Sequence, residues 1–294
     1  MDELKLAIVG LDTSHAIHFP ERLQSLDIPT ERRVSGMRVV NCMKFMTPFT
    51  TSEVLAERTK QLESWGVRVT ENFDEAVDDC DAILLEINDP AYHVEYFERA
   101  AKLGKPIFLD KPIADTYENG QKIASIAEAE GVRFFTASSL RFVPELQSAS
   151  ADVGKPELAS VYGPLGTALA GSSIVWYGVH AFEMLERAMG AGASRVTAIR
   201  DEIGVVVTVG YRDGRRGVVE LTEGNYQYGG RLRSADMVKS YEVDMTNAYS
   251  GLLEQIRKFL VENEIPVPIE ESLEIMHLLD AAERSYDSGS PVEL

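Results

Sequence analysis

The sequence predicts an α/β protein, with an N-terminal doubly wound parallel (Rossmann) sheet and a C-terminal α+β domain that holds a largely antiparallel open sheet. In the first half, short and mostly apolar runs alternate with segments of helical periodicity. This alternation indicates right-handed βαβ units, and apolar strands indicate that both faces of the sheet are covered. In the second half, an Asp-Gly turn joins two strand-like runs, which favours a hairpin.

The first half contains six expected strands and four expected helices. The strands are expected at residues 4–10, 37–45, 67–69, 81–87, 106–109 and 132–136. The helices are expected at residues 15–26, 52–65, 90–103 and 115–130, the last two ending at Gly104 and Gly131. Glycine just after a periodic segment is a typical helix stop.

The pattern changes near residue 140, so the chain is divided into a domain of residues 1–138 and a domain of residues 139–294. A helix is expected at 174–189, followed by strands at 195–201, 203–212 and 216–223. Two further helices, 246–263 and 271–288, are separated by the break at Pro266–Pro268. An alternative is that the terminal helix packs back on the first domain.

Composition excludes several classes of protein. The 47 acidic and 29 basic residues give a net charge of −18, which argues against a nucleic-acid partner because such binding depends on Lys and Arg. No run of 18 apolar residues is present, so no membrane span is expected. The start of the chain lacks the pattern of a signal peptide. Cys42 and Cys80 show no C-x-x-C spacing, which indicates buried thiols in a reducing compartment. A cytoplasmic location is expected.

Lys111 is the most informative candidate residue. It follows the apolar strand 106–109 and precedes the helix at 115–130. In an open α/β sheet, ligands bind outside the carboxyl ends of the strands, so a cation at this position is placed to act on a substrate. The alternative is a surface lysine that pairs with Asp110 or Asp115.

The turn after the first strand departs from the dinucleotide fingerprint G-x-G-x-x-G. It reads Gly10-Leu11-Asp12-Thr13-Ser14-His15, so only the first glycine is present. The second glycine normally lets the backbone approach a pyrophosphate, and the third allows close packing of helix on strand. We expect Gly10, Asp12, Thr13, Ser14 and His15 to contact the cofactor, with helix capping as the alternative for Asp12, Thr13 or Ser14.

Two further features of this region bear on ligands. Asp12, His15 and His18 can share one helical face, but no metal site is predicted because such spacing is common in ordinary helices. The end of the second strand carries no acidic residue for a ribose, and Lys44 lies there instead. A lysine at this position is compatible with NADP.

Four stretches together resemble the Gfo/Idh/MocA family of oxidoreductases. They are the N-terminal strand–turn–helix, the closing helices around Pro266, and two motif groups. The first group is similar to the family's P-x-x-H, GK and EKP succession: Pro90 to His93, Gly104-Lys105-Pro106 and Asp110-Lys111-Pro112. The second is similar to its G-x-H-x-x-D-x-L helix: Gly178 to Leu185, with His180 as the histidine.

The resemblance implies an NAD- or NADP-dependent oxidoreductase that acts on a sugar, inositol or related polyol. It implies that Lys111 contacts substrate and nicotinamide, and that His180 is the acid/base on the reacting hydroxyl. A neutral imidazole suits that proton transfer near pH 7, and an ammonium stabilises alkoxide charge. A homodimer or homotetramer is also implied. The alternatives are a family member that binds a small ligand without hydride transfer, and a non-redox lyase or isomerase.

The remaining site candidates flank these two residues. Asn88 and His93 lie on the same sheet edge as Lys111 and are expected to contact the cofactor, and Arg141 is expected to contact substrate. Trp176 stands four residues before His180, where the family usually has Asp, and is either a stacking wall for a ring substrate or core packing. Tyr177 is a further substrate contact. The alternative for His180 is a buried core histidine whose ring nitrogens are hydrogen-bonded and which has no catalytic role.

Overall fold

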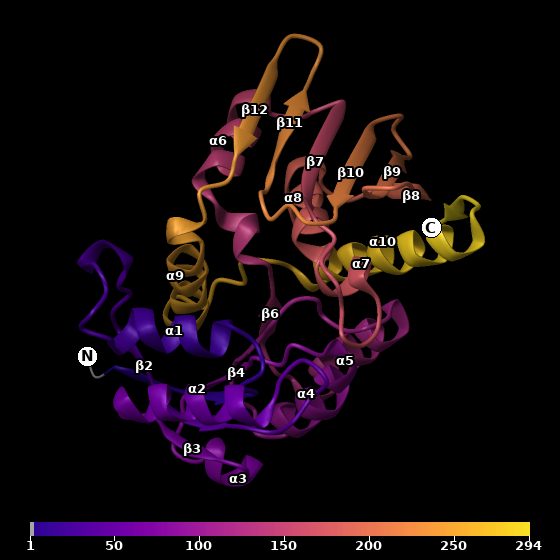
Figure 1. Cartoon of the computed structure of the whole chain (residues 1–294). Coiled ribbons are helices and arrows are strands. Elements are labelled where there is room, and N and C mark those ends of the chain that lie inside the picture. Colours follow the sequence, from indigo (N-terminus) through magenta and orange to yellow (C-terminus); the bar gives the residue numbers. More distant parts are fainter. Residues whose placement is uncertain (1–2) are drawn as a thin grey trace. The chain divides into compact units, whose positions relative to one another are not determined.

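The computed structural model describes residues 3–294 and divides the chain into two compact units (Figure 1). The first unit is the N-terminal segment that ends at Thr136, together with Tyr249–Pro268. The second unit contains Ala137–Ala248 and Ile269–Leu294. The predicted fold class is confirmed: one unit contains a parallel sheet, and the other contains a mixed, largely antiparallel sheet.

The first unit is a six-stranded sheet with the strand order β3-β2-β1-β4-β5-β6, and every pairing is parallel. Its strands are β1 (Leu4–Val9), β2 (Met37–Met43), β3 (Arg68–Thr70), β4 (Ala82–Leu85), β5 (Ile107–Leu109) and β6 (Phe134–Thr136). Its helices are α1 (His15–Gln24), α2 (Ser52–Ser64), α3 (Phe73–Ala76), α4 (His93–Ala101), α5 (Tyr117–Glu130) and α9 (Ala248–Val261). The strand order reverses between β1 and β4, and this is the point where doubly wound sheets bind ligands.

Burial of apolar side chains on both faces explains the order of this sheet. The four residues of β4 and the three of β5 are all buried, as expected for parallel strands covered by helices. The helix α9 contributes Phe259, whose ring centroid lies 5.1 Å from that of Phe135 on β6. It is therefore α9, the penultimate helix, that belongs to the first unit, whereas the terminal helix α10 (Ile269–Ser288) belongs to the second.

The second unit is a seven-stranded sheet with the order β12-β11-β7-β10-β9-β8-β13. All its pairings are antiparallel except that of β7 with β10. The helices α6, α8 and α10 contact its strands. The bounds are α6 (Pro144–Val153), β7 (Leu158–Pro164), α7 (Ser173–Trp176), α8 (Val179–Met189), β8 (Ala193–Arg200), β9 (Gly204–Tyr211), β10 (Arg216–Thr222), β11 (Gly229–Arg233), β12 (Val238–Glu242) and β13 (Val292–Glu293).

The structure differs from the sequence prediction in several elements of the second unit. The helix expected at 174–189 is broken at Gly178, where a Cβ atom would lie 2.5 Å from the carbonyl oxygen of Ile174 and 2.8 Å from a Leu221 methyl group. The elements α6, β7, β11, β12 and β13 were not predicted. Polar and apolar residues mix along β11 and β12, which weakens their strand pattern. Within residues 3–294, no helix is long and apolar enough to cross a membrane.

Candidate active site

Lys111 lies directly beyond the carboxyl end of β5, as the sequence predicted, but it is not a surface residue. Only 7% of Lys111 is exposed, and its Nζ atom lies 3.7 Å from Oδ2 of the fully buried Asp110. The backbone N–H of Lys111 also donates to Oδ1 of Asp110, at 2.8 Å. Asp110 therefore holds both the backbone and the ammonium group of Lys111 at the end of the strand.

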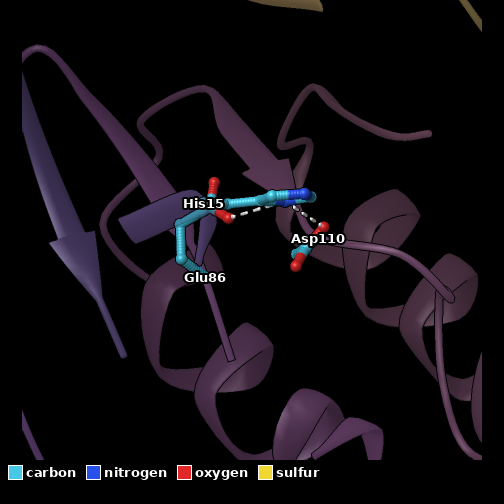
Figure 2. Close-up of side chains that lie close together, drawn as sticks. All are labelled: His15, Glu86 and Asp110. Carbon is cyan, nitrogen blue, oxygen red and sulfur yellow. Dashed lines mark hydrogen bonds and ion pairs between the residues drawn. The ribbon is translucent and has the colours of Figure 1, made fainter. Parts of the chain in front are cut away.

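His15, the first residue of α1, is bonded to the same aspartate. Its Nδ1 atom lies 3.0 Å from Oδ1 of Asp110 and 3.6 Å from Oε2 of Glu86, which follows β4 (Figure 2). The imidazole ring stacks on Phe19 with centroids 5.2 Å apart and meets the ring of Tyr249 edge-on at 5.0 Å. The residue in place of the third fingerprint glycine thus fills the space between α1 and the ends of β4 and β5.

The close approach of these groups shifts their pKa values. Burial disfavours the imidazolium of His15, but the charge and hydrogen bond of Asp110 and the proximity of Glu86 outweigh it and raise the pKa of His15 to about 10. Burial, followed by repulsion from Asp110, raises the pKa of Glu86 to about 7. Burial alone would raise the pKa of Asp110, but the charges of His15 and Lys111 hold it well below its usual range.

Asp12 occupies the position of the second fingerprint glycine, and its carboxylate joins three loops of the sheet edge. Oδ2 accepts a hydrogen bond of 2.7 Å from the hydroxyl of Thr47, and Oδ1 accepts one of 2.9 Å from the backbone N–H of Asn88. The residue is 3% exposed, and burial raises its pKa although these two hydrogen bonds oppose the shift. Asp12 is therefore not the cap of α1, a role that falls to Ser14.

The first fingerprint glycine keeps its steric role. Gly10 has φ +107°, and a Cβ atom there would lie 2.2 Å from the carbonyl oxygen of Glu86. Further along the turn, the Thr13 hydroxyl accepts the N–H of His15 at 3.4 Å. Arg58 on α2 donates to the carbonyl oxygens of Leu11 and Thr13, at 2.8 and 3.1 Å. Arg58 could not be predicted from the sequence, because its partners are carbonyl groups of a distant loop.

A cavity of about 590 Å³ lies on the second sheet, whereas one of about 480 Å³ lies at the ends of β2 and β3 in the first unit. The second of these combines apolar side chains with a cation and a hydroxyl, and is lined by Lys44, Phe45, Met46, Ser52, Leu55, Ala56 and Glu71. The Lys44 ammonium lies 3.9 Å from Glu71. Doubly wound sheets bind the ribose of a dinucleotide at the end of the second strand, which is where this cavity lies.

His93 connects two of the loops at this edge. Its Nε2 atom lies 2.8 Å from the carbonyl oxygen of Ile87 and its Nδ1 atom 3.3 Å from that of Ile113. The side chain is fully buried. These contacts give His93 a structural role between the loops after β4 and β5, and its predicted contact with a cofactor stays a prediction, as does that of Asn88.

In the second unit, His180 lies in the first turn of α8. Its Nδ1 atom is 2.7 Å from the hydroxyl of Ser138. Its ring meets those of Tyr177 and Tyr228 edge-on, with centroids 5.5 and 5.7 Å away. Trp176 lies next to Tyr177, with ring centroids 5.0 Å apart. The predicted residues His180, Trp176 and Tyr177 are therefore brought together, and Ser138 joins them although the sequence did not single it out.

Arg141, predicted to contact substrate, is 3% exposed and is surrounded by carboxylates of the second unit. Its guanidinium lies 3.4 Å from Glu183 and 2.5 Å from Glu186, and it donates a short hydrogen bond to Glu271. Burial raises the pKa of Glu183 to about 7 although Arg141 opposes the shift. This network gives Arg141 a structural role, and its contact with substrate stays a prediction.

The comparison with protein families gives a match for part of the first unit. Residues 46–138, a stretch that contains Asn88, His93 and Lys111, match the model of the oxidoreductase family with an NAD-binding Rossmann fold, Gfo/Idh/MocA. This region belongs to the Gfo/Idh/MocA family. The assignment agrees with the motif order in the sequence, and the match begins after the altered turn at Gly10.

Known relatives are distant in sequence. The uncharacterized protein YMR315W of Saccharomyces cerevisiae is 28% identical over 102 residues, which covers 34% of this chain and 29% of the yeast protein. The chain thus spans less than a third of the length of the curated relative that it matches.

Solved structures resemble the whole chain. GenD2 from gentamicin A biosynthesis, solved in complex with NAD, has a TM-score of 0.82 and 16% identity, covering 100% of this chain and 97% of GenD2. The myo-inositol 2-dehydrogenase of Lactobacillus plantarum has a TM-score of 0.80 and 15% identity, covering 100% of both chains. At such identities the likeness shows the fold.

Sequence reasoning missed Glu86 and Ser138 as site residues. Glu86 stands in the apolar run Asp-Ala-Ile-Leu-Leu-Glu-Ile, and a charged residue at the end of a buried strand is itself a signal, because a fully buried Glu needs a partner. Ser138 offered no comparable signal, because its partner His180 is 42 residues further along the chain.

Proposed function

We propose that the protein is an NAD- or NADP-dependent oxidoreductase that acts on a hydroxyl group of a sugar, inositol or related polyol. The observation that carries the proposal is the position of Lys111, inside a family-matched Rossmann region and fixed at a strand end by Asp110. An ammonium group held by a buried carboxylate keeps its place without reorganisation, which is what stabilisation of an alkoxide requires.

The cofactor would be held by the edge of the parallel sheet. The cavity at the ends of β2 and β3 fits the adenosine end, and Lys44 offers a cation for the 2′-phosphate of NADP. Gly10 preserves the tight turn. The carboxylate of Asp12 does not fit as well, because it takes up the N–H of Asn88 and brings a negative charge to the turn. The bound cofactor would supply the hydride acceptor.

In this proposal His180 removes the hydroxyl proton. Ser138 holds Nδ1 of the imidazole, so the proton transfer is assigned to Nε2. The rings of Trp176 and Tyr177 form an aromatic surface beside His180, which suits the apolar face of a cyclic polyol. The joint action of Lys111 and His180 on one hydroxyl rests on the family resemblance and on this chemistry.

The experiment is a titration of the purified protein with NADH and NADPH, followed by nicotinamide fluorescence and thermal shift. Saturable binding is expected, with an increase in stability of about 2.7 kcal/mol at a hundredfold excess over Kd. We expect NADPH to bind more tightly than NADH, and Lys44→Ala to remove the difference. The absence of any response at millimolar concentrations of both nucleotides would refute the proposal.

Turnover is then measured with a panel of cyclic and linear polyols that includes myo-inositol. Lys111→Met and His180→Gln are each expected to lower kcat about a hundredfold or more while nucleotide affinity changes little. The matched control is Lys122→Met, because Lys122 is an exposed lysine that pairs with Glu118 and Asn119 of its own helix α5. If the two variants together lose only the product of their separate effects, the residues do not act as one unit.

One observation favours a second function, the binding of a small ligand without hydride transfer. Asp12 accepts the hydroxyl of Thr47 and the N–H of Asn88, so it occupies two donors near the turn and places a negative charge where a pyrophosphate would lie. A chain of this type would bind a polyol beside His180 and show no nucleotide binding. Calorimetric titration with the same polyols, in the absence of nucleotide, distinguishes the two functions.

We also propose a homodimer or homotetramer formed through the sheet face whose side chains alternate with the buried ones. Ile199 on β8 and Val238 on β12 lie on this face and are 65% and 53% exposed. Light scattering should give a mass of two or four chains, and Ile199→Glu should lower it. A monomer at all concentrations would contradict this proposal.

A further inference from the structure

Three ionisable side chains converge beneath Lys111 in the first unit. His15 begins α1, Glu86 follows β4 and Asp110 follows β5, and these elements are neighbours because the strand order is β1-β4-β5. One ligand atom from each lies within 4.8 Å of the others, and all three residues are buried. In Figure 2, dashed lines join the imidazole of His15 to one carboxylate oxygen of Glu86 and to one of Asp110.

The two distances from His15 to the carboxylates match the spacing of ligands on one metal ion. An ion with bonds of about 2.0–2.2 Å in tetrahedral geometry holds its ligand atoms about 3.3–3.6 Å apart, and closer in an octahedral arrangement. The Nδ1 atom of His15 is 3.0 Å from Asp110 and 3.6 Å from Glu86. Both distances fit a shared ion with shifts of a few tenths of an ångström.

Glu86 supplies a second and independent observation. Neither of its carboxylate oxygens has a hydrogen-bond partner within residues 3–294, although the side chain is fully buried. If Nδ1 of His15 carries a proton, it donates to Asp110, whose oxygen lies 3.0 Å away. The oxygen of Glu86, at 3.6 Å from Nδ1, is too far to accept the same proton. A metal ion, in contrast, engages both carboxylates at once.

The surrounding contacts orient the three groups. Oδ1 of Asp110 accepts the backbone N–H of Lys111, and the ring of His15 is held between Phe19 and Tyr249. Partners of this kind, which fix ligands without touching the ion, are usual in metal sites. Lys111 lies on the Oδ2 side of Asp110, so its ammonium group stays outside the three ligand atoms.

We propose that His15 Nδ1, Glu86 and Asp110 bind one divalent transition-metal ion of the Zn²⁺ or Mn²⁺ type. One imidazole and two carboxylates suit such ions, and the two carboxylates neutralise the charge of the ion. The ion ties the start of α1 to the ends of β4 and β5, and so fixes the position of Lys111. It is a structural and positioning ion, because its ligands are closed off from solvent.

The experiment begins from protein unfolded in denaturant with EDTA and refolded with or without Zn²⁺, Mn²⁺ or Co²⁺, because a closed site exchanges slowly. Elemental analysis after gel filtration is expected to give about one ion per chain, and the refolded metal form is expected to have a higher Tm. The visible spectrum of the Co²⁺ form reports nitrogen and oxygen ligands, and it requires no variant.

Glu86→Gln and His15→Gln are each expected to lower metal affinity at least tenfold. The matched control is His18→Gln, since His18 lies on the same helix and its Nδ1 atom pairs with Glu21 instead. The proposal is overturned if the wild type refolds equally well with no bound ion at 100-fold excess metal. It is also overturned if Glu86→Gln binds the ion as the wild type does, or if His18→Gln removes it.

Discussion

The Nδ1 atom of His15 lies 3.0 Å from Oδ1 of Asp110, so the first residue of α1 is bonded to the residue that precedes Lys111. In a dinucleotide fingerprint the position of His15 is reserved for glycine, because the helix packs closely on the sheet. Here an imidazole ring occupies that position and stacks on Phe19. The residue that replaces the glycine therefore bonds to Asp110, the carboxylate that also holds Lys111.

The charge of Asp12 is expected to weaken nucleotide binding. Asp12→Asn keeps the shape of the side chain and an acceptor for the N–H of Asn88 but removes the negative charge. Because a like charge about 5 Å from a phosphate costs roughly 3 kcal/mol at an effective dielectric constant of 20, affinity for NADH or NADPH should rise at least tenfold. Fluorescence titration measures the change.

The same residue predicts a pH dependence. Burial raises the pKa of Asp12, so the wild type should bind the nucleotide more tightly as the pH falls through that pKa. Asp12→Asn should lack this dependence. An affinity that is unchanged by the substitution at every pH would show that the phosphates do not approach this turn.

Ser138 is expected to act as a positioning residue for His180. Ser138→Ala removes the hydrogen bond to Nδ1, so the ring loses its fixed orientation and kcat should fall about tenfold to a hundredfold with little change in KM. The pH profile of kcat should also shift, which a purely structural defect would not cause. The control is Ser139→Ala, at a neighbouring buried serine. Equal losses in both variants would count against the role.

The carboxylates around Arg141 predict a pH dependence of stability in the second unit. The pKa of Glu183 is about 7 in the folded state and 4.5 in the reference state. The folded state therefore binds more protons, and stability that is present below pH 4.5 is lost as the pH rises through about 7, by about 3 kcal/mol at most. Glu186 shifts in the same direction, mainly because it is buried.

Glu183→Gln should flatten this dependence, because the amide stays neutral throughout. Denaturant midpoints between pH 4.5 and 8.5 measure it, with Glu220→Gln on an exposed strand position as the control. A wild-type midpoint that rises across this range would contradict the assignment.

The sequence predicted most of the first unit because parallel strands are apolar throughout. β4 and β5 were visible as short apolar runs, and Lys111 stood out as the charge that followed one of them. The β11–β12 hairpin escaped because polar residues interrupt both strands. Short-range sequence patterns indicate which residues are buried and where turns lie. They carry little information about which distant residues contact each other.

The contacts of the site were less predictable for the same reason. His15 and Asp110 are 95 residues apart, and Arg141 and Glu271 are 130 apart. No local pattern states which carboxylate a buried histidine or arginine will reach, so the contacts of Arg141 with three glutamates could not be predicted. The sequence showed that Asp12 departs from the glycine fingerprint. Its hydrogen bonds to Thr47 and Asn88 became visible only in the folded structure.

Gly10→Ala tests how tightly the turn after β1 presses on β4. Gly10 has φ +107°, and a Cβ atom would lie 2.2 Å from the carbonyl oxygen of Glu86, so backbone must move. We expect a loss of stability of about 3 kcal/mol or more, measured by the denaturant midpoint. The matched control is Gly66→Ala, which has φ +80° but no atom within 4 Å, and should cost only about 1 kcal/mol. Similar losses at both positions would mean that backbone conformation alone, and not contact with Glu86, requires glycine at position 10.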